Sequence, residues 1–238
     1  MTWSIIARDR KNGQFGIAVA TRFFAVGALV PYAQAGIGAV ATQALVNPFY
    51  GGDGLKLLRA GKSAAEVVAA LVAGDEGRDH RQLHVMDAMG SIAAHTGQAC
   101  VAWCGHRAGE AVSVAGNMLA GPRVLEDTLT VYLAGNALPF PRRLIAAMRA
   151  GEAAGGDKRG KQSAALVIQG DEEWPDLDLR VDDHQDPLAE LERLERVSRE
   201  RFTHFMRVLP SHRDRCGIID RTAIEAKIAD AIAAEGQS

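Results

Sequence analysis

Apolar residues in the first part of the chain form short runs separated by turn residues. The runs cover residues 3–9, 14–21, 27–35 and 36–43, and β-branched side chains are frequent in them. Such runs predict strands, and Asn12-Gly13 between the first two is typical of a hairpin turn. Apolar and polar positions alternate poorly, which indicates strands that are covered on both faces.

The pattern then changes from strands to helices and back. Asn47 is positioned to cap one helix, and Ser63 with Glu66 has the spacing of a capping box for the next. Strands are expected again at residues 82–87, 91–96, 100–104 and 111–114, helices at 123–134 and 141–150, and a strand at 163–170. This order predicts an α+β protein with two largely antiparallel sheets packed face to face and helices outside each, an αββα sandwich of four layers.

The last third of the chain has a different composition. Residues 171–186 carry eight carboxylates against Arg180 alone, which is typical of a solvated connector. Asp186 and Pro187 predict the start of a helix. A final helix is expected from Thr222, with Glu225 completing a capping box.

The composition argues against several classes of protein. Of 238 residues, 47% are hydrophobic and 24% charged, and the net charge is -2, so no basic field points to nucleic acid. Residues 23–50 carry no charge, but prolines, glycines and amides interrupt them, so we expect no membrane span. Charged residues follow only a brief apolar start, and there are three cysteines. We therefore expect a cytoplasmic protein without a disulfide framework.

Two polar segments are candidates for chemistry. Residues 155–166 resemble a phosphate-binding loop, but Gln162 stands where Ser or Thr is required, and a strand follows where a helix should begin. The segment suits either a substrate pocket or an ordinary charged turn. Cys100, Cys104 and His106 match no common zinc spacing, so we expect no metal site. His95 suits a pocket or a structural role.

Thr2 is the remaining candidate nucleophile, because no internal nucleophile motif occurs. At a free N-terminus, the α-amine, with a pKa of about 8, can serve as the base for the threonine hydroxyl. Methionine before a small residue is commonly removed. If Met1 stayed attached, Thr2 would have no free amine. Alternatively, Thr2 is only part of an edge strand.

Several stretches together resemble one family, among them TWSIIARD, GIAVATRFFAVGALVP, GAVATQALVNPFYG, AAHTG, GNMLAGP, GEAAGGDKRGKQSAAL and DLRVDDHQDP. It is a family of bacterial and archaeal proteins known only as a domain of unknown function and grouped with the N-terminal nucleophile hydrolases. The resemblance covers about residues 2–208. It implies the αββα sandwich and an amide hydrolase in which Thr2 attacks the carbonyl and forms an ester that water then hydrolyses.

The chain departs from the proteasome-type members of that group. Ala20 stands where those proteins place an Asp, and no lysine occurs between Lys11 and Lys56. Arg22 is the one cation in that stretch. The resemblance and the residue types assign Asn117 to the oxyanion. They assign the substrate pocket to Arg22, His95, Asp157, Arg159 and Gln162.

The sequence thus favours a hydrolase of a small amide or peptide-like bond that needs no cofactor. The alternative is a non-catalytic protein with the same sandwich that binds a small molecule. We expect a main domain at residues 1–210 and a helical extension at 211–238. The apolar face of the last helix makes a homodimer reasonable.

Overall fold

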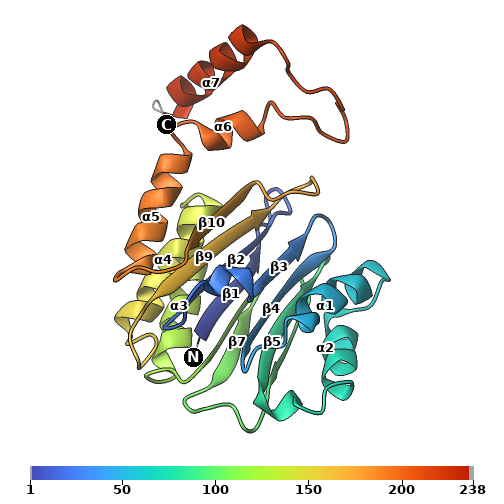
Figure 1. Ribbon diagram of the computed structural model, residues 1–238, viewed down its shortest axis with the longest axis vertical. Coiled ribbons are helices and arrows are strands. Elements are labelled where there is room, and N and C mark those ends of the chain that lie inside the picture. The colour runs from blue at the N-terminus through green and yellow to red at the C-terminus, as the bar shows by residue number, and fades with distance from the viewer. Residues whose placement is uncertain (1, 236–238) are drawn as a thin grey trace.

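The computed structural model describes residues 2–235, and within them strands and helices alternate in groups (Figure 1). The strands are β1 (Thr2–Arg8), β2 (Phe15–Thr21), β3 (Pro31–Gln34), β4 (Gly38–Ala44), β5 (Arg81–Asp87), β6 (Ile92–Thr96), β7 (Gly105–Gly109), β8 (Val112–Asn117), β9 (Ser163–Gln169) and β10 (Leu177–Val181). The α-helices are α1 (Phe49–Arg59), α2 (Ala64–Ala73), α3 (Arg123–Ala134), α4 (Phe140–Ala153), α5 (Pro187–Ser198), α6 (Phe202–Met206) and α7 (Arg221–Glu235). Two 3-10 turns are η1 (Val26–Ala28) and η2 (Arg78–His80).

The strands form two antiparallel sheets. The larger has the order β10-β9-β2-β1-β8-β7, and the smaller has the order β3-β4-β5-β6. Helices α3 and α4 pack on the larger sheet, whereas α1 and α2 pack on the smaller one, so the layers run helix, sheet, sheet, helix (Figure 1). This confirms the predicted mixed α+β protein with two antiparallel sheets.

Strand β1 lies in the middle of the larger sheet and shows why alternation is poor. Trp3 and Ile5 belong to the core beneath α3 and α4, while Ile6 belongs to the core between the sheets. Both faces of the strand are therefore buried. Each fully buried large side chain contributes roughly 2 kcal/mol to the stability of the fold through apolar burial. Gly16 on β2 lets α4 approach closely, because a Cβ there would overlap Leu144 and Phe140.

Local signals predicted many boundaries correctly. The helix expected at residues 123–134 is α3, and the hydroxyl of Ser63 accepts from the backbone of Glu66 in a complete capping box. The carboxylate of Asp186 caps α5 by accepting from the backbone N–H of Ala189 at 3.1 Å.

Several local predictions were wrong. The strand expected at residues 27–35 is shorter, because η1 occupies Val26–Ala28 and β3 begins at Pro31. Residues 100–104 form a loop that precedes β7, with a thiol hydrogen bond from Cys104 to the carbonyl of Cys100 in place of strand pairing. The acidic stretch is more than a connector, because it contains β10, which pairs with β9. The last helix is capped by Asp220, whose carboxylate accepts from the backbone N–H of Ala223 at 2.9 Å.

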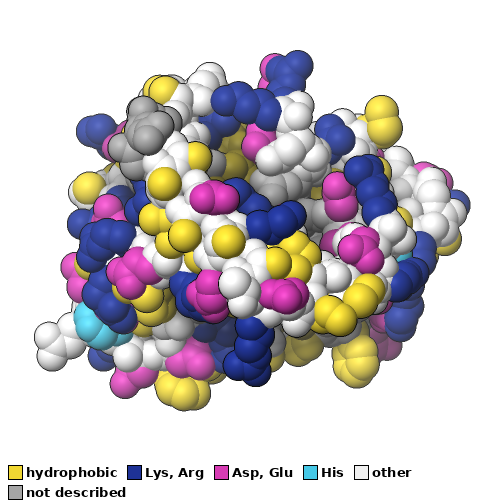
Figure 2. Space-filling model, turned by 90° about the horizontal axis from the view of Figure 1, so that it is seen from above, with side chains coloured by type: hydrophobic (Ala, Val, Ile, Leu, Met, Phe, Trp, Pro, Cys, Tyr) yellow, Lys and Arg dark blue, Asp and Glu magenta, His cyan; other side chains and the backbone are white. Residues whose placement is uncertain are grey.

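The surface carries charges of both signs. On the face seen from above, Lys and Arg side chains lie among Asp and Glu side chains, and apolar groups are scattered between them (Figure 2). Helices α6 and α7 contact each other beyond α5 (Figure 1), and Arg201 pairs with Glu225 at 2.6 Å. Over residues 2–235 we find no helix with the length and apolar character needed to cross a bilayer.

Candidate functional site

Thr2 is the first residue of the central strand β1. In the sheet register it lies between Thr21 of β2 and Asn117 of β8. Because side chains alternate along a strand and Ile6 faces the smaller sheet, Thr2 faces that sheet as well. Its hydroxyl donates to the Thr21 hydroxyl at 3.2 Å, and the residue is 7% exposed. The threonine is thus held at the end of the sandwich, between the two sheets.

Asn117 is tied to the backbone of Thr2. Its amide nitrogen donates to the Thr2 carbonyl at 3.5 Å and to Oε1 of Gln82 at 3.1 Å. An amide has two hydrogens, and both are engaged in these contacts. The structure thus places Asn117 directly beside Thr2, with its amide hydrogens directed at these two acceptors.

Gln82 joins the two sheets next to this point. Its amide nitrogen donates to the Gly116 carbonyl of β8 at 2.8 Å and to the Thr96 hydroxyl of β6 at 3.0 Å. Its Oε1 also accepts from the amide of Gln43 at 2.8 Å. The residue is fully buried, so these bonds replace the water that its amide loses on folding.

The polar layer continues from Gln43 toward the middle of the sandwich. The Ser4 hydroxyl donates to Oε1 of Gln43 at 2.7 Å, and it lies 2.9 Å from Nε2 of His84. Since the one Ser4 proton is used, Nε2 carries the histidine proton and donates to Ser4, and Nδ1 accepts from the Ser113 hydroxyl at 2.9 Å. Burial, with a smaller contribution from His106, lowers the pKa of His84 to about 3. The imidazole is therefore neutral at physiological pH.

Within residues 2–235, the polar layer between the sheets consists of six buried side chains. Ser4, Gln43, Gln82, His84, Ser113 and Asn117 are each at most 2% exposed. Ser4 and His84 resemble a serine–histidine pair, but both are 0% exposed, so no substrate reaches them. Their arrangement fixes the strands that carry Thr2.

The segment from Gly155 to Ser163 lies against the end of β2. The backbone N–H of Gln162 donates to the Thr21 carbonyl at 2.9 Å, and the buried Asp157 carboxylate accepts from the backbone N–H of Arg22 at 2.8 Å. Asp157 also accepts from the backbone N–H of Arg159 at 2.8 Å and from its guanidinium at 3.1 Å. The fold thus gathers Arg22, Asp157, Arg159 and Gln162 beside Thr21, the strand neighbour of Thr2.

Asp157→Ala is expected to lower the free energy of unfolding by about 2–4 kcal/mol, because it leaves the N–H groups of Arg22 and Arg159 without their buried acceptor. Urea unfolding measures the change. Asp183→Ala is the matched control: Asp183 is exposed and accepts from the Gln162 amide at 3.1 Å, so its loss should cost below about 1 kcal/mol. Equal effects of the two substitutions would contradict the anchoring role of Asp157.

An open hollow adjoins this cluster. It has a volume of about 600 Å³ and is lined by Arg22, Lys161, Asp183, His184 and Gln185. Nη1 of Arg22 lies 3.4 Å from the Lys161 carbonyl, and Lys161 pairs with Asp186 at 3.0 Å. The Arg22 guanidinium is thus a charged donor at the rim, within reach of solvent.

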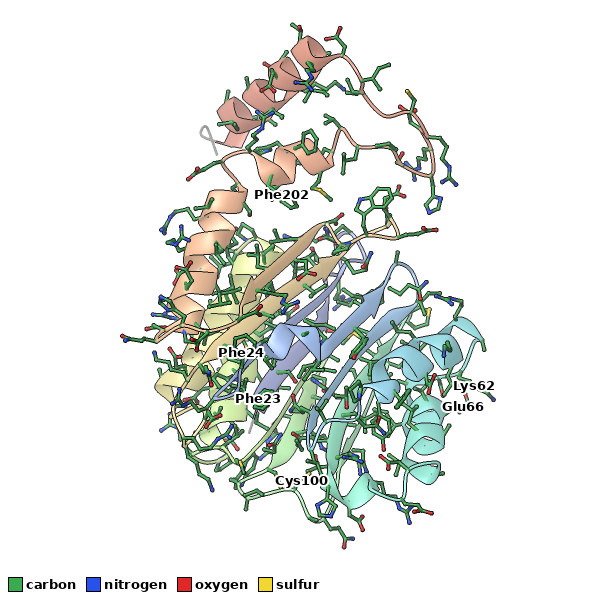
Figure 3. All side chains as sticks on the ribbon, viewed as in Figure 1. Phe23, Phe24, Lys62, Glu66, Cys100 and Phe202 are labelled. Atoms are coloured by element: carbon green, nitrogen blue, oxygen red, sulfur yellow. The ribbon has the colours of Figure 1, made fainter. Side chains whose placement is uncertain are left out.

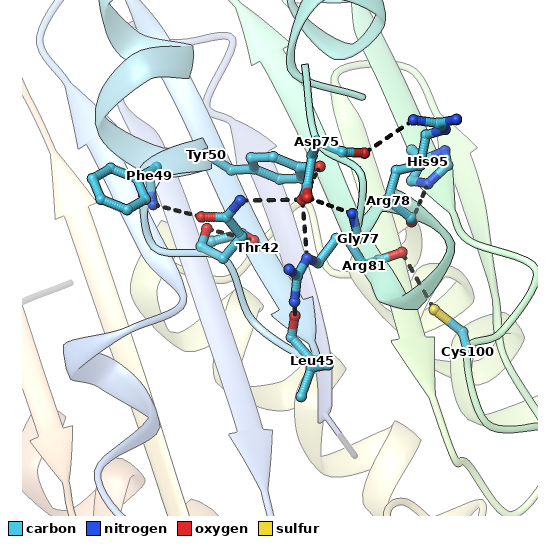
Figure 4. A network of polar contacts seen from close by, with 11 residues as sticks. Thr42, Leu45, Phe49, Tyr50, Asp75, Gly77, Arg78, Arg81, His95 and Cys100 are labelled. Atoms are coloured by element: carbon cyan, nitrogen blue, oxygen red, sulfur yellow. Dashed lines mark hydrogen bonds and ion pairs between the residues drawn. The ribbon is translucent and has the colours of Figure 1, made fainter. Parts of the chain in front are cut away.

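His95 lies elsewhere. It pairs with Leu83, whose side chain belongs to the core under α1 and α2, so it faces away from Thr2. Its Nε2 is 2.9 Å from the Arg78 carbonyl (Figure 4). The structure does not bring His95 to the pocket for which the sequence nominated it.

A second polar network surrounds Asp75 (Figure 4). Its carboxylate accepts from the Tyr50 hydroxyl at 2.8 Å, from Asn47 at 3.1 Å and from Arg81 at 3.0 Å. These hydrogen bonds outweigh the opposing effect of burial and hold the pKa of Asp75 well below its ordinary value. The network joins the start of α1 to the end of α2 and the start of β5, which is a structural role.

Cys100 and Cys104 lie in the loop before β7 and are partly shielded from solvent. Burial raises the pKa values of the Cys100 and Cys104 thiols. Over residues 2–235, no three or more His, Cys, Asp or Glu side chains cluster closely enough to hold a metal ion. Phe23 and Phe24 lie two and three residues after the end of β2 and are 56% and 60% exposed, so they border the end of the sandwich that carries Thr2 (Figure 3).

Sequence reasoning missed Thr21 and the polar layer. A usable signal was present: Ser4, His84 and Ser113 each lie between two apolar residues of a strand. Such residues must find hydrogen-bond partners when they are buried. Nothing in the pattern, however, tells which of them meet.

Two solved structures match this chain to very different degrees. Protein SPO2555 from Silicibacter pomeroyi, known from a crystal structure and itself assigned to DUF1028, is 33% identical, with a TM-score of 0.85 over 92% of this chain and 99% of its own. Anbu (ancestral beta-subunit) from Yersinia bercovieri is 10% identical, with a TM-score of 0.38 over 82% of this chain and 94% of its own. No protein with a curated description matches.

The family assignment rests on most of the chain. The model of the family of unknown function DUF1028 matches residues 2–191, from the first residue of β1 into α5. The match confirms the resemblance to a domain of unknown function that the sequence motifs indicated. With the fold shared with SPO2555, it shows that this chain belongs to the DUF1028 family.

Proposed function

We propose that the protein is an N-terminal nucleophile hydrolase that cleaves a small amide or peptide-like bond, with Thr2 as the nucleophile. The observation that carries the proposal is the place of Thr2, at the start of the central strand with its hydroxyl held between Thr21 and the second sheet. The order of layers, helix, sheet, sheet, helix, and the resemblance of the sequence to this class of hydrolase support it.

The mechanism requires the loss of Met1. The α-amine of Thr2 then takes the hydroxyl proton, directly or through a water, while the oxygen attacks the amide carbonyl. The proton passes to the leaving amine, an ester to Thr2 forms, and water hydrolyses that ester to regenerate the hydroxyl. Thr21 orients the resting hydroxyl, and Asn117 fixes the carbonyl of Thr2.

The surrounding charges suit a polar substrate. Arg22 lies one residue beyond Thr21 and presents a guanidinium at the rim, which matches a substrate carboxylate. Asp157 pairs with the Arg159 guanidinium and accepts from the backbone N–H of Arg22, so the Arg22 guanidinium carries the net positive charge of these three residues. The placement of residues 155–163 beside Thr21 favours the enzyme over the binding-protein alternative, for which a distant cluster is expected.

The proposal is tested by the N-terminus itself. In protein purified at low expression from its native host, intact mass should show Met1 missing from most molecules. Mild periodate cleaves an N-terminal Thr between Cα and Cβ only when its amine is free, with release of acetaldehyde, so it should lower the mass of these molecules. A matched sample with an extra N-terminal glycine should not show this loss of mass. Retention of Met1 in most native molecules overturns the proposal.

A further inference from the structure

A second cavity lies at the far end of β1. It has a volume of about 380 Å³, within the range of small-molecule sites. Strand β1 carries Thr2 at one end and Arg8 at the other, a separation of about 20 Å at the usual rise of a strand. The cavity is therefore distinct from the site at Thr2, and ligand binding there does not depend on the proposed hydrolysis.

The polar side of this cavity has an excess of cations. Arg8, Arg10, Lys11 and Arg143 line it together with two acids, Asp9 and Glu110. Glu110 forms an ion pair with Arg10 at 2.6 Å. Asp9 accepts from the backbone N–H of Lys11 at 3.0 Å. The four cations of the lining thus exceed its two acids by two positive charges.

Arg8 is a lining cation of this cavity with an unusual environment. It is half-buried, its Nε is shielded from solvent, and that nitrogen has no hydrogen-bond partner. Among the described residues, neither the Arg8 guanidinium nor the Lys11 ammonium forms an ion pair or a side-chain hydrogen bond. A shielded donor without an acceptor costs free energy, which a bound anion would recover.

The groove between α4 and α5 provides a contrast. It is also lined by arginines, but there the buried Glu195 carboxylate accepts from Arg142 at 3.4 Å and from Arg199 at 3.1 Å. Arg142 and Arg199 are therefore paired with a carboxylate of the protein. Arg8 has none, which singles out the cavity at the end of β1.

The other side of the cavity is apolar. Leu133, Leu138, Pro139 and Phe140 line it, with the Tyr132 ring beneath the Arg143 guanidinium at 3.8 Å. Arg143 also donates to the Tyr132 carbonyl at 2.6 Å, so the arginine is fixed in place. A ligand that fills both sides has an anionic group next to an apolar ring or chain.

We propose that this cavity binds a small organic anion, a carboxylate or phosphate ester joined to an apolar group. The forked donors of Arg8 bind the anionic oxygens, since a guanidinium matches a carboxylate or phosphate with two parallel hydrogen bonds. Lys11 adds charge at the mouth, and Phe140 with its apolar neighbours holds the uncharged part.

Titration calorimetry at low salt with three probes tests the class of ligand. Phenyl phosphate has both parts, inorganic phosphate lacks the ring, and phenol lacks the charge. We expect saturable one-to-one binding of phenyl phosphate with a Kd below about 1 mM, and at least about tenfold weaker binding of the other two. The proposal is overturned if phenyl phosphate shows no saturable binding, or if inorganic phosphate binds as tightly.

Variants test the place of binding. Arg8→Met keeps the apolar stem and should weaken phenyl phosphate binding at least about tenfold. Lys11 is exposed, so Lys11→Met leaves the fold intact and should weaken binding about threefold, which carries the test if Arg8→Met does not fold. Arg193→Met on α5 and Thr2→Ala should bind as the wild type does. Unchanged binding in Arg8→Met, or in Lys11→Met when Arg8→Met is unfolded, overturns the proposal.

Discussion

Thr2→Ala is expected to abolish amide hydrolysis, with a loss of at least about 10³-fold for any amide that the wild type cleaves. The substitution removes the attacking oxygen and leaves the α-amine in place. It breaks one hydrogen bond, to Thr21 at 3.2 Å, so the free energy of unfolding should fall by only about 1 kcal/mol. Hydrolysis of an amide library, followed by mass spectrometry, measures the effect.

Two further variants make the result specific. Thr2→Ser keeps a hydroxyl beside the amine and should retain part of the activity. Thr42→Ala removes another buried threonine, on β4, whose hydroxyl donates to the Asn47 carbonyl at 3.3 Å on the side of α1. It should leave hydrolysis unchanged. Full activity in Thr2→Ala would refute the nucleophile, and the non-catalytic binding protein would then be the better account.

His84 is expected to make the fold sensitive to mild acid. Its pKa in the folded protein is about 3, below the ordinary value of 6.5, so the unfolded chain binds a proton that the native state excludes. The stability this provides is complete above pH 6.5 and is lost as the pH falls toward 3. The slope is at most about 1.4 kcal/mol per pH unit, which gives a loss of roughly 2–3 kcal/mol between pH 6.5 and 4.5.

His84→Gln removes the titrating group and keeps a side chain that donates and accepts. Urea unfolding from pH 7 to 4.5 should show a flatter dependence on pH for this variant than for the wild type. Val85→Ala, on the same buried strand, is the control: it should lower stability by a similar amount at every pH. Parallel curves for the wild type and His84→Gln would contradict the role of the buried imidazole.

Local patterns predicted the elements well because their causes are local. The Asn12-Gly13 turn, the Ser63 capping box and the Asp186 cap each act within a few residues. The poor alternation of apolar positions also predicted sheets covered on both faces. Loop 100–104 was mistaken for a strand because its composition is apolar, whereas its backbone pairs with the ends of other elements, as in the bond from Met118 to the Val101 carbonyl.

The candidate site also combines features that the sequence could predict with features that it could not. The sequence nominated Thr2, Asn117 and the cluster from Asp157 to Gln162, because their residue types and motifs stand out, and the structure brings them to the same end of β1 and β2. It placed His95 among them, although the register of β6 against β5 turns that side chain to the opposite face. A shift of one residue reverses the face of a strand, and the sequence does not fix the register between distant strands.

The sequence by itself thus determined the mixed α+β class with two antiparallel sheets and most of its elements, and it nominated the hydroxyl that a free N-terminus would expose. Only the tertiary structure decided which polar residues meet: Ser4 with Gln43 and His84, and Asn117 with Gln82 and Thr2. These partners are between 35 and 115 residues apart. Their contacts follow from the pairing and stacking of sheets, since a buried polar group is stable only where the packed fold supplies its partner.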